Sequence, residues 1–358
     1  MIRASTDEQQ STLIIGEIGQ NHNGNMGFAM SMIDIAALPV IDHFTQEQLQ
    51  GVNAIKLTKR DLEEELTAEA ERQPYNGPHS FGPTYGEHRR AIELSYEEHR
   101  DLGQYAHERG LLFIETLCSP KCVRLCEMVN IDYLKVASRD LTNIPLLTEL
   151  AATRVPIILS TGMGDFDALD RALDEITQYH EQITILHCIS EYPARYENIG
   201  LPRIAELKRR YPQYRIGYSD HSIGIMIPVA AVSMGATVIE KHITLSRRLK
   251  GADHAGSVEP DGLWRMTRDI RNLERAMQAV PEDRRRAATA STRLKLERSL
   301  ATRRPIGKGE RLTEQDLVML SPGGGMTWDQ RELVVGRPAR DEIPQRAQLQ
   351  PEMFDLSA

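Results

Sequence analysis

The sequence has few cysteines and no long apolar run. Its 358 residues include four cysteines, too few for the disulfide framework that stabilises small secreted proteins. No stretch approaches the roughly 20 consecutive apolar residues that a membrane-spanning helix requires. Residues 1–10 lack the apolar core of a secretory signal, so we do not expect export. These absences predict a cytoplasmic protein with no membrane partner.

An excess of basic residues is also missing. The 51 Asp and Glu residues outnumber the 43 Lys and Arg residues, the formal net charge is −8, and the basic residues form no stripe. Binding to a phosphate backbone needs clustered Lys and Arg, so we expect no nucleic-acid partner. A small anionic ligand needs only a few local charges and remains compatible with this composition.

Three of the cysteines recur at intervals of four residues, at Cys118, Cys122 and Cys126. A helix would place the last two on one face, which would suit an iron–sulfur or zinc site. Metal motifs usually contain closer cysteine pairs or a fourth ligand at suitable spacing. We therefore favour the alternative that these residues are small, buried and apolar.

Short apolar runs alternate with helical patterns along most of the chain. The strand candidates are residues 13–18, 54–57, 112–114, 133–136, 157–160, 183–188, 215–218 and 238–241, and amphipathic stretches include 96–109, 144–153, 166–179 and 201–211. Eight such units predict an α/β fold, a parallel (β/α)₈ TIM barrel. Residues 39–50 look like an insertion before the second strand.

A second module follows the barrel. Residues 280–292 are rich in Arg, Glu and Ala, which predicts the last helix running into a linker. From about Ser299, short alternating stretches are broken by Gly and Pro. We predict a barrel domain at 1–282, a linker at 283–298 and a small β-rich domain at 299–358, which we expect to dock on a barrel.

Polar residues follow or end all eight predicted strands, at the edge where barrel enzymes hold their chemistry. They are Glu17, Lys56, Thr116, Lys135 with Ser138, Ser160, Ser190 with Tyr192, Ser219 with His221, and Glu240 with His242. Lysines buried in a barrel mouth need an anion, and hydroxyls supply neutral donors. Together Lys56, Lys135, Ser138, Ser160 and Ser219 predict a cradle for a phosphate and a carboxylate on one small molecule.

Two histidines end adjacent predicted strands, so the imidazoles of His221 and His242 could converge on one ion. With a carboxylate such as Glu17, they would suit Mn²⁺, Zn²⁺, Fe²⁺ or Co²⁺ in an open catalytic site.

At this point the chain resembles the sialic acid synthases, which include N-acetylneuraminate, legionaminate, pseudaminate and spore-coat polysaccharide synthases. The resemblance rests on residues 16–24, 134–138, 158–163, 187–193, 217–222 and 240–242, which occur in the family's order. Residues 304–354 resemble the antifreeze-like (SAF) domain that follows the barrel in this family.

The resemblance implies an enzyme that joins phosphoenolpyruvate to an aldehyde sugar, giving a 2-keto-3-deoxy acid. By motif, phosphoenolpyruvate would bind at Lys56, Thr116, Lys135, Ser138, Ser160, Ser190 and Ser219. His221 and His242 would hold a divalent metal, usually Mn²⁺ or Mg²⁺, while Glu17, Tyr192, Asp140 and Asp253 would face the sugar. Such enzymes are usually domain-swapped homodimers.

The implied mechanism gives Glu17 a second task. Carbon C3 of phosphoenolpyruvate attacks an aldehyde polarised by the metal, and water then adds at C2 before phosphate leaves. Glu17 is the candidate for positioning or deprotonating that water.

Several departures from the family pattern fall where the sugar would bind. Two residues after Lys56, where the family commonly has a glutamine, this chain has Thr58. The family's Ser-Gly-Glu that follows the second lysine, Lys135, is replaced here by Ser138, Arg139 and Asp140. Ser321 stands where the family has an arginine that reaches the partner's sugar, so a charged donor is lost. These differences predict a change in the sugar.

Two other functions remain open. The first is another phosphoenolpyruvate- or metal-dependent lyase or aldolase on the same barrel, and the second is a non-enzymatic sugar-binding protein that uses the C-terminal domain. Both lysines and both histidines argue against simple binding, which would not need them.

Overall fold

The computed structural model describes residues 11–355. Residues 1–10, on which the expectation about export rests, lie outside that range. The chain forms two compact units, Met1–Met277 and Gln278–Ala358. Within the described residues, no helix combines the length and apolar character needed to cross a bilayer.

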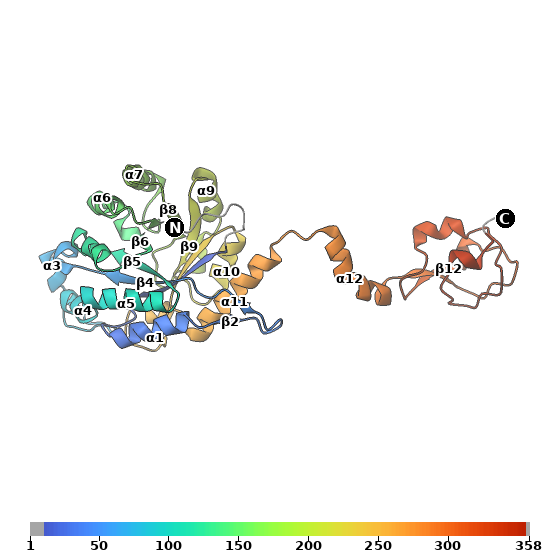
Figure 1. Ribbon diagram of the computed structural model, residues 1–358, viewed down its shortest axis with the longest axis horizontal. Coiled ribbons are helices and arrows are strands. Elements are labelled where there is room, and N and C mark those ends of the chain that lie inside the picture. The colour runs from blue at the N-terminus through green and yellow to red at the C-terminus, as the bar shows by residue number, and fades with distance from the viewer. Residues whose placement is uncertain (1–10, 356–358) are drawn as a thin grey trace. The chain divides into compact units, whose positions relative to one another are not determined.

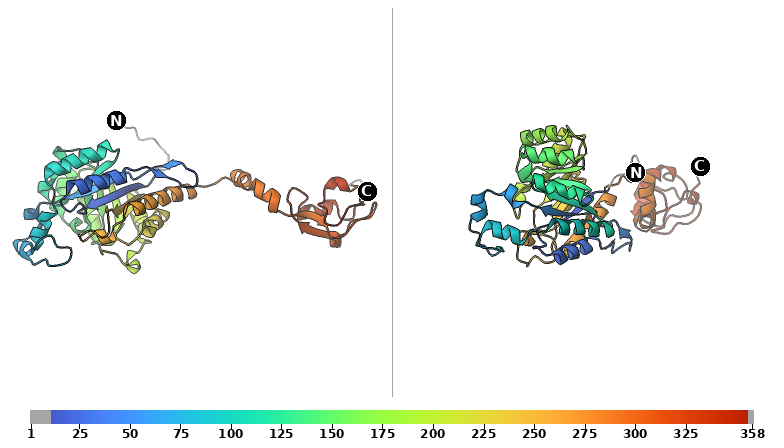
Figure 2. Two further views of the ribbon diagram at one scale, coloured as in Figure 1. Left: turned by 90° about the horizontal axis from the view of Figure 1, so that it is seen from below. Right: turned by 60° about the vertical axis from the view of Figure 1, so that its left-hand side comes forward.

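The first unit is a closed barrel of eight parallel strands, which confirms the predicted fold. The strands are β1 (Leu13–Gly19), β4 (Ala54–Lys59), β5 (Leu112–Leu117), β6 (Tyr133–Val136), β7 (Ile157–Ser160), β8 (Ile183–Cys188), β9 (Arg215–Asp220) and β10 (Val238–His242). Their order around the barrel is β1-β10-β9-β8-β7-β6-β5-β4, and β4 pairs with β1 to close it. Figures 1 and 2 show helices around the outside of the strands.

Helices connect the strands. They are α1 (Met26–Ala36), α2 (Leu62–Glu65), α3 (Ala68–Arg72), α4 (Tyr85–Ala91), α5 (Tyr96–Glu108), α6 (Ile144–Ala152), α7 (Phe166–Ile176), α8 (Tyr196–Ile199), α9 (Arg203–Arg210), α10 (Met226–Ser233) and α11 (Pro260–Ala276). Helix α5 begins with a capping box, in which Ser95 and Glu98 accept from each other's backbone N–H. The connection from β4 to β5 is longer than the others and contains α2 to α5.

Side chains along the strands alternate between the barrel interior and the surrounding helices. The interior cluster comprises Leu13, Ile15, Ala54, Ile114, Ile158, Leu186 and Val238. Residues that point the other way, such as Ile14, Ile55 and Ile239, join the core beneath the helices. The next interior positions along the strands include Glu17, Lys56 and Glu240, so the apolar interior ends at a polar layer.

Several strands are longer than the apolar runs indicated. Strand β5 extends to Leu117 instead of residue 114, and β4 to Lys59 instead of residue 57. Thr58 is the backbone partner of Thr116 there, so pairing continues past the last apolar interior residue. The apolar runs underestimate the length of these strands, because polar side chains can occupy interior positions of a strand where a cavity begins.

The inserted segment 39–50 is a hairpin that packs against α11. Strands β2 (Val40–Ile41) and β3 (Gln48–Leu49) are antiparallel, and Asn272 of α11 donates to Asp42 Oδ2 at 2.7 Å. Arg271 donates to the carbonyl oxygens of Thr12, Gln50 and Gly51. The hairpin therefore lies at the N-terminal ends of β1 and β4, away from the polar layer.

Cys122 and Cys126 lie in a 3₁₀ helix, Pro120–Glu127, and Cys118 lies two residues before it begins. Cys118 and Cys122 are buried, Cys126 is half-buried, and none forms a disulfide. No group of three or more His, Cys, Asp or Glu side chains in residues 11–355 is placed to hold a metal ion. The burial of Cys118 and Cys122 agrees with the alternative favoured above, whereas Cys126 is only half-buried.

The second unit has its own hydrophobic core. It contains α12 (Glu282–Leu296), β11 (Ser299–Thr302) and β12 (Leu317–Leu320), and the two strands are antiparallel. Core members include Leu300, Ile306, Leu317 and Phe354. The last barrel helix ends at Ala276, earlier than expected, and α12 is a separate helix with no buried residue.

Candidate active site

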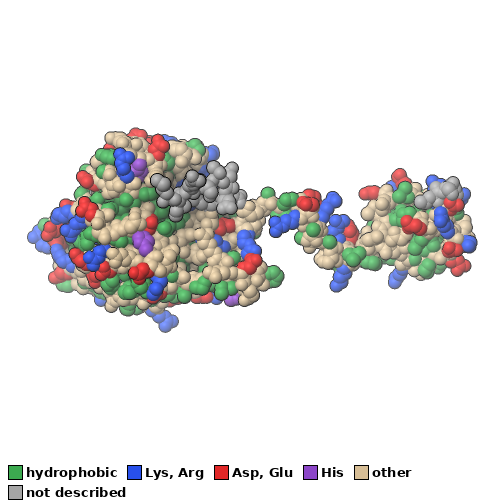
Figure 3. Space-filling view, in the orientation of Figure 1, with side chains coloured by type: hydrophobic (Ala, Val, Ile, Leu, Met, Phe, Trp, Pro, Cys, Tyr) green, Lys and Arg blue, Asp and Glu red, His purple; other side chains and the backbone are tan. Residues whose placement is uncertain are grey.

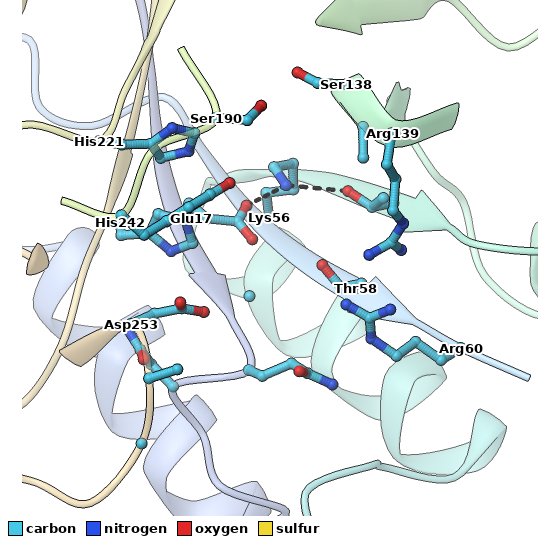
Figure 4. A pocket seen from close by; sticks show the side chains of 18 of the residues that line it. Glu17, Lys56, Thr58, Arg60, Ser138, Arg139, Ser190, His221, His242 and Asp253 are labelled. Carbon is cyan, nitrogen blue, oxygen red and sulfur yellow. Dashed lines mark hydrogen bonds and ion pairs between the residues drawn. The ribbon is translucent and has the colours of Figure 1, made fainter. Parts of the chain in front are cut away.

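Four buried charged side chains form the floor of a cavity at the C-terminal ends of the strands (Figure 4). The Lys56 ammonium pairs with the Glu17 carboxylate, donates to Thr116 Oγ1 at 3.0 Å, and lies 3.9 Å from Glu240 Oε2. Lys135 lies 3.7 Å from Glu240 Oε1. None of these four residues is more than 5% exposed. Two lysines and two carboxylates therefore share one desolvated layer.

The environment shifts the pKa values of these groups in opposite directions. Burial raises the pKa of Glu17 to about 7, against the opposing effect of Lys56. Burial alone would also raise the pKa of Glu240, but Lys135 and Lys56 outweigh it and lower that pKa to about 2. Burial lowers the pKa of Lys135. Glu17 can therefore gain or lose a proton near neutral pH.

Donors beside this layer are incompletely satisfied. The Lys135 ammonium donates to Val136 O at a long 3.4 Å, and Ser160 Oγ is buried without a hydrogen-bond partner among the described residues. A Cβ on Gly162 would come within 2.6 Å of Ser190 Oγ and 2.9 Å of Ser138 Oγ, so glycine lets these hydroxyls converge. Orphaned buried donors next to a cavity favour an anionic ligand.

His221 and His242 lie side by side at the ends of β9 and β10, with ring centroids 5.7 Å apart. His221 Nδ1 lies 2.8 Å from Ile189 O, a hydrogen bond that leaves Nε2 free to bind a ligand. His242 Nδ1 is buried with no partner in the described chain, and burial together with His221 lowers the pKa of His242 to about 4. Two imidazoles, each with an available ring nitrogen, fit a divalent metal ion whose other ligands are water or substrate.

The cavity has a volume of about 320 Å³ and brings together every predicted site residue except Asp140. Those that line it are Glu17, Lys56, Thr116, Lys135, Ser138, Ser160, Ser190, Tyr192, Ser219, His221, His242 and Asp253. Tyr192 packs on His221 with ring centroids 4.0 Å apart.

Asp140 does not line this cavity. Its carboxylate accepts from Arg139 Nε at 3.2 Å and from Asn143 Nδ2 at 3.3 Å. Residues Ser138–Asp140 form a 3₁₀ turn, in which successive side chains rotate by about 120°. The turn therefore directs Ser138 into the cavity and leads Asp140 out of it.

Several lining residues carried no predicted role. They are Gln20, Asn23, Arg60, Tyr75, Phe81, His88, Arg89, Ile92, Met163, Cys188 and Glu240, besides small residues and Asn21. Thr58 and Arg139, predicted as departures from the family pattern where the sugar would bind, line the cavity as well. The sequence already placed Glu240 at the polar edge without a role, and its position two residues before His242, on the same face of one strand, indicates that it enters the cavity. Tyr75, Phe81, His88 and Arg89 come from the long β4–β5 connection, where no pattern in the sequence indicates proximity to the cavity.

Comparison with known proteins gives consistent matches to one group. Residues 45–281 match the NeuB family, and residues 297–355 match the SAF domain. N-acetylneuraminate-9-phosphate synthase of Homo sapiens is 34% identical over 315 residues, covering 88% of this chain and 84% of that protein. N,N'-diacetyllegionaminic acid synthase of Legionella pneumophila is 33% identical over 334 residues, covering 90% and 89%.

A solved structure supports the same assignment. The N-acetylneuraminic acid (sialic acid) synthetase from Leptospira borgpetersenii, crystallised with citrate, superposes with a TM-score of 0.63 at 30% identity. The match covers 79% of this chain and 91% of that one. The resemblance inferred from the six motifs and the C-terminal segment is confirmed.

Proposed function

Because the chain belongs to the NeuB family and carries a SAF domain, we propose that it is a phosphoenolpyruvate-dependent sugar acid synthase. It would condense phosphoenolpyruvate with an aldehyde sugar to give a 2-keto-3-deoxy nonulosonic acid and inorganic phosphate. The observation that carries the proposal is the buried layer of two lysines beside the unsatisfied hydroxyl of Ser160. A small molecule with both a phosphate and a carboxylate would complete that layer.

Phosphoenolpyruvate would lie over this floor. Lys56 and Lys135 would meet its carboxylate and phosphate, and Ser138, Ser160 and Ser190 would donate neutral hydrogen bonds, with Thr116 and Ser219 at the edge. The incomplete hydrogen bonding of Lys135 and Ser160 supports this placement, because a charged donor buried without a strong acceptor is costly.

The two histidines would hold a divalent metal ion, Mn²⁺ or Mg²⁺ by resemblance to the family. When bound, such an ion polarises the aldehyde of the acceptor and stabilises the charge that develops on its oxygen. The hydrogen bond from His221 to Ile189 O would fix the ring for this task. Tyr192 and Asp253, which line the same part of the cavity, would contact the sugar.

Glu17 would act as the group that accepts and donates protons during the reaction. The C2=C3 π electrons of phosphoenolpyruvate form the new bond from C3 to the aldehyde carbon, and the C=O π electrons move to the aldehyde oxygen. Water adds to C2 and loses one proton, which replaces the one that Glu17 gives to this oxygen to form the hydroxyl group. A carboxyl group with a pKa of about 7 can accept that proton at neutral pH. Collapse of the tetrahedral C2 centre then breaks the bond to the phosphate oxygen, leaving the 2-keto group and inorganic phosphate.

We also propose, from the family resemblance, a cytoplasmic domain-swapped homodimer in which the partner's SAF domain covers the barrel mouth. The pairing would complete the sugar site, where Ser321 stands in place of the family's arginine.

The test is release of inorganic phosphate from phosphoenolpyruvate with Mn²⁺ across a panel of plain, 2-acetamido, diacetamido and phosphorylated hexoses. We expect release only when a suitable sugar is present, and its loss in His221→Ala and in Lys135→Met. An exposed variant, Arg265→Met, is the matched control. Release without any sugar would instead indicate a lyase, and no release with any member of the panel would count against a synthase for these sugars.

A further inference from the structure

Two arginines occupy one wall of the cavity. Arg60 directly follows β4, and Arg139 lies in the turn after β6, so the two flank β5. In the closed barrel, β5 and β6 lie across from β9 and β10, which carry the histidines. Figure 4 shows the guanidinium groups of both arginines near Thr58, on the side of Lys56 away from His221 and His242. The cavity therefore has two chemically different sides.

A single carboxylate holds the two arginines together. Glu65 Oε1 pairs with Arg60 Nη1 and lies 3.4 Å from Arg139 Nη2. Arg139 Nη2 also donates to Cys118 Sγ at 2.9 Å, but burial raises the pKa of that thiol to about 12, so it brings no negative charge. The remaining carboxylate at this site is Asp140, which accepts from Arg139 Nε.

Arg60 keeps unused hydrogen-bonding capacity in a buried position. The residue is only 8% exposed, and its Nε atom is buried with no hydrogen-bond partner in the described chain. A guanidinium group carries five donors in a rigid fork that matches phosphate and carboxylate oxygens. A buried donor without an acceptor costs free energy, so this arrangement is better satisfied with an anion bound.

More cationic side chains than carboxylates line the cavity itself. Five cationic side chains (Lys56, Arg60, Arg89, Lys135 and Arg139) face three carboxylates (Glu17, Glu240 and Asp253). The lysines share the floor with the two glutamates, whereas Arg60 and Arg139 pair with Glu65 and Asp140, which do not line the cavity. The unpartnered Nε of Arg60, and not an excess of positive charge, is therefore what favours an anion here. On the outer face of the barrel unit seen in Figure 3, by contrast, acidic and basic side chains are interspersed.

We infer, building on the proposed synthase activity, that Arg60 and Arg139 bind an anionic group carried by the acceptor sugar, either a phosphate or a carboxylate. The aldehyde end would lie at His221 and His242, and the anionic end against the opposite wall. Ser138 and Ser190 lie apart from the guanidinium groups in Figure 4, so phosphoenolpyruvate on the floor would leave them available. A neutral hexose would leave the arginine pair without a ligand.

The experiment compares acceptors that differ in one anionic group: an N-acylated hexosamine and its 6-phosphate, and a hexose and its uronate. For the parent enzyme, kcat/KM should favour an anionic member by about tenfold or more, as expected for a charge-assisted hydrogen bond. In Arg60→Gln and Arg139→Gln, that preference should disappear through a higher KM for the anionic acceptor, while the KM for phosphoenolpyruvate stays unchanged. Arg109→Gln, which removes an exposed arginine outside the cavity, should behave as the parent.

Two results would overturn the inference. One is an equal or better kcat/KM for the neutral acceptors. The other is a higher KM for phosphoenolpyruvate in both variants, which would assign the arginines to that substrate. Arg139→Gly, which restores the family pattern, and Arg60→Lys, which keeps the charge but loses the fork, guard against a folding defect in either glutamine variant.

Calorimetric titration of the sugar phosphate without phosphoenolpyruvate separates this inference from the proposed function. It is possible to test the anion site even if no acceptor supports phosphate release. If the parent then binds the sugar phosphate and Arg60→Gln binds it about tenfold or more weakly, the anion site is supported although the synthase activity is refuted. Binding that is absent, or equal in parent and variant, would refute the anion site whatever the activity.

Discussion

At the scale of single residues, the buried lysines near the barrel mouth differ in the direction in which their side chains point. Lys241 lies between interior residues Glu240 and His242 but points outward, where it pairs with Asp220 at 2.6 Å and is fully buried. Lys56 and Lys135 point inward, where a ligand can reach them. Because the alternation of a strand decides between these outcomes, similar buried lysines have different roles: Lys241 holds neighbouring strands together, and the other two line the cavity.

Buried histidines make the stability of the fold depend on pH. His22 is 1% exposed, and burial, with a contribution from His99, lowers its pKa from 6.5 to about 3. As the pH falls below 6.5, the unfolded chain gains a proton at this residue that the folded chain does not accept until about pH 3. The free energy of unfolding should therefore fall with decreasing pH in this window, by roughly 1.4 kcal/mol per pH unit from His22 alone.

Replacing this residue tests the assignment. In His22→Asn, the amide oxygen can replace Nδ1 as the acceptor for the Gly24 N–H, so the hydrogen bond survives without the titration. Denaturant unfolding between pH 6.5 and pH 4.5 should give a shallower loss of stability for the variant than for the parent. Parallel curves would show that His22 does not titrate in this way.

At the scale of elements, α11 ties together the start of the barrel. The Arg271 side chain is 4% exposed and also donates to Asn53 Oδ1 at 2.9 Å, while that oxygen accepts from Ile14 N. One guanidinium group therefore connects the helix to the N-terminal ends of β1 and β4 and to the hairpin. The polar layer lies at the other end of the strands and does not contact Arg271.

Removal of the Arg271 hydrogen bonds should lower the stability of the barrel without changing the catalytic activity. Arg271→Met should lower the free energy of unfolding by about 3 kcal/mol, because several buried acceptors lose a charged donor. Arg275→Met, one turn along the same helix, removes only an exposed ion pair with Glu47 and should change stability by about 0.5 kcal/mol or less. Chemical denaturation provides the comparison, and equal effects of the two variants would contradict it.

At the scale of the whole molecule, the two units have separate hydrophobic cores. The core of the smaller unit is built from residues 300–354 alone, and it belongs to a module of a size that is only marginally stable. The barrel core is built from residues 13–270. We therefore expect calorimetry to resolve two unfolding transitions.

A substitution in the smaller core should move only one of them. Phe354 is fully buried there, and Phe354→Ala should destabilise that unit by about 3–5 kcal/mol. The transition of the barrel should keep its midpoint, whereas Ile270→Ala, in the barrel core, should lower that midpoint and leave the smaller transition in place. A single transition that moves with either variant would show that the units unfold together.

The sequence by itself determined the barrel and most of the cavity floor. Alternation along a strand is local, so an apolar run that ends in Glu17 or Lys56 already predicts a polar residue at the mouth. The same holds for His221 and His242, which end adjacent strands. Asp140 was not predictable in this way, because a 3₁₀ turn after the strand directs its side chain away from the cavity.

Only the tertiary structure decided which distant residues meet. Arg60 and Arg139 become neighbours because the sheet places β4 and β6 on either side of β5 and the segments after both strands turn toward Glu65, which bridges them. Hairpin 39–50 finds its place because α11 returns to the start of the barrel. Such contacts depend on how the whole chain closes, and no local pattern of apolar and polar residues records that closure.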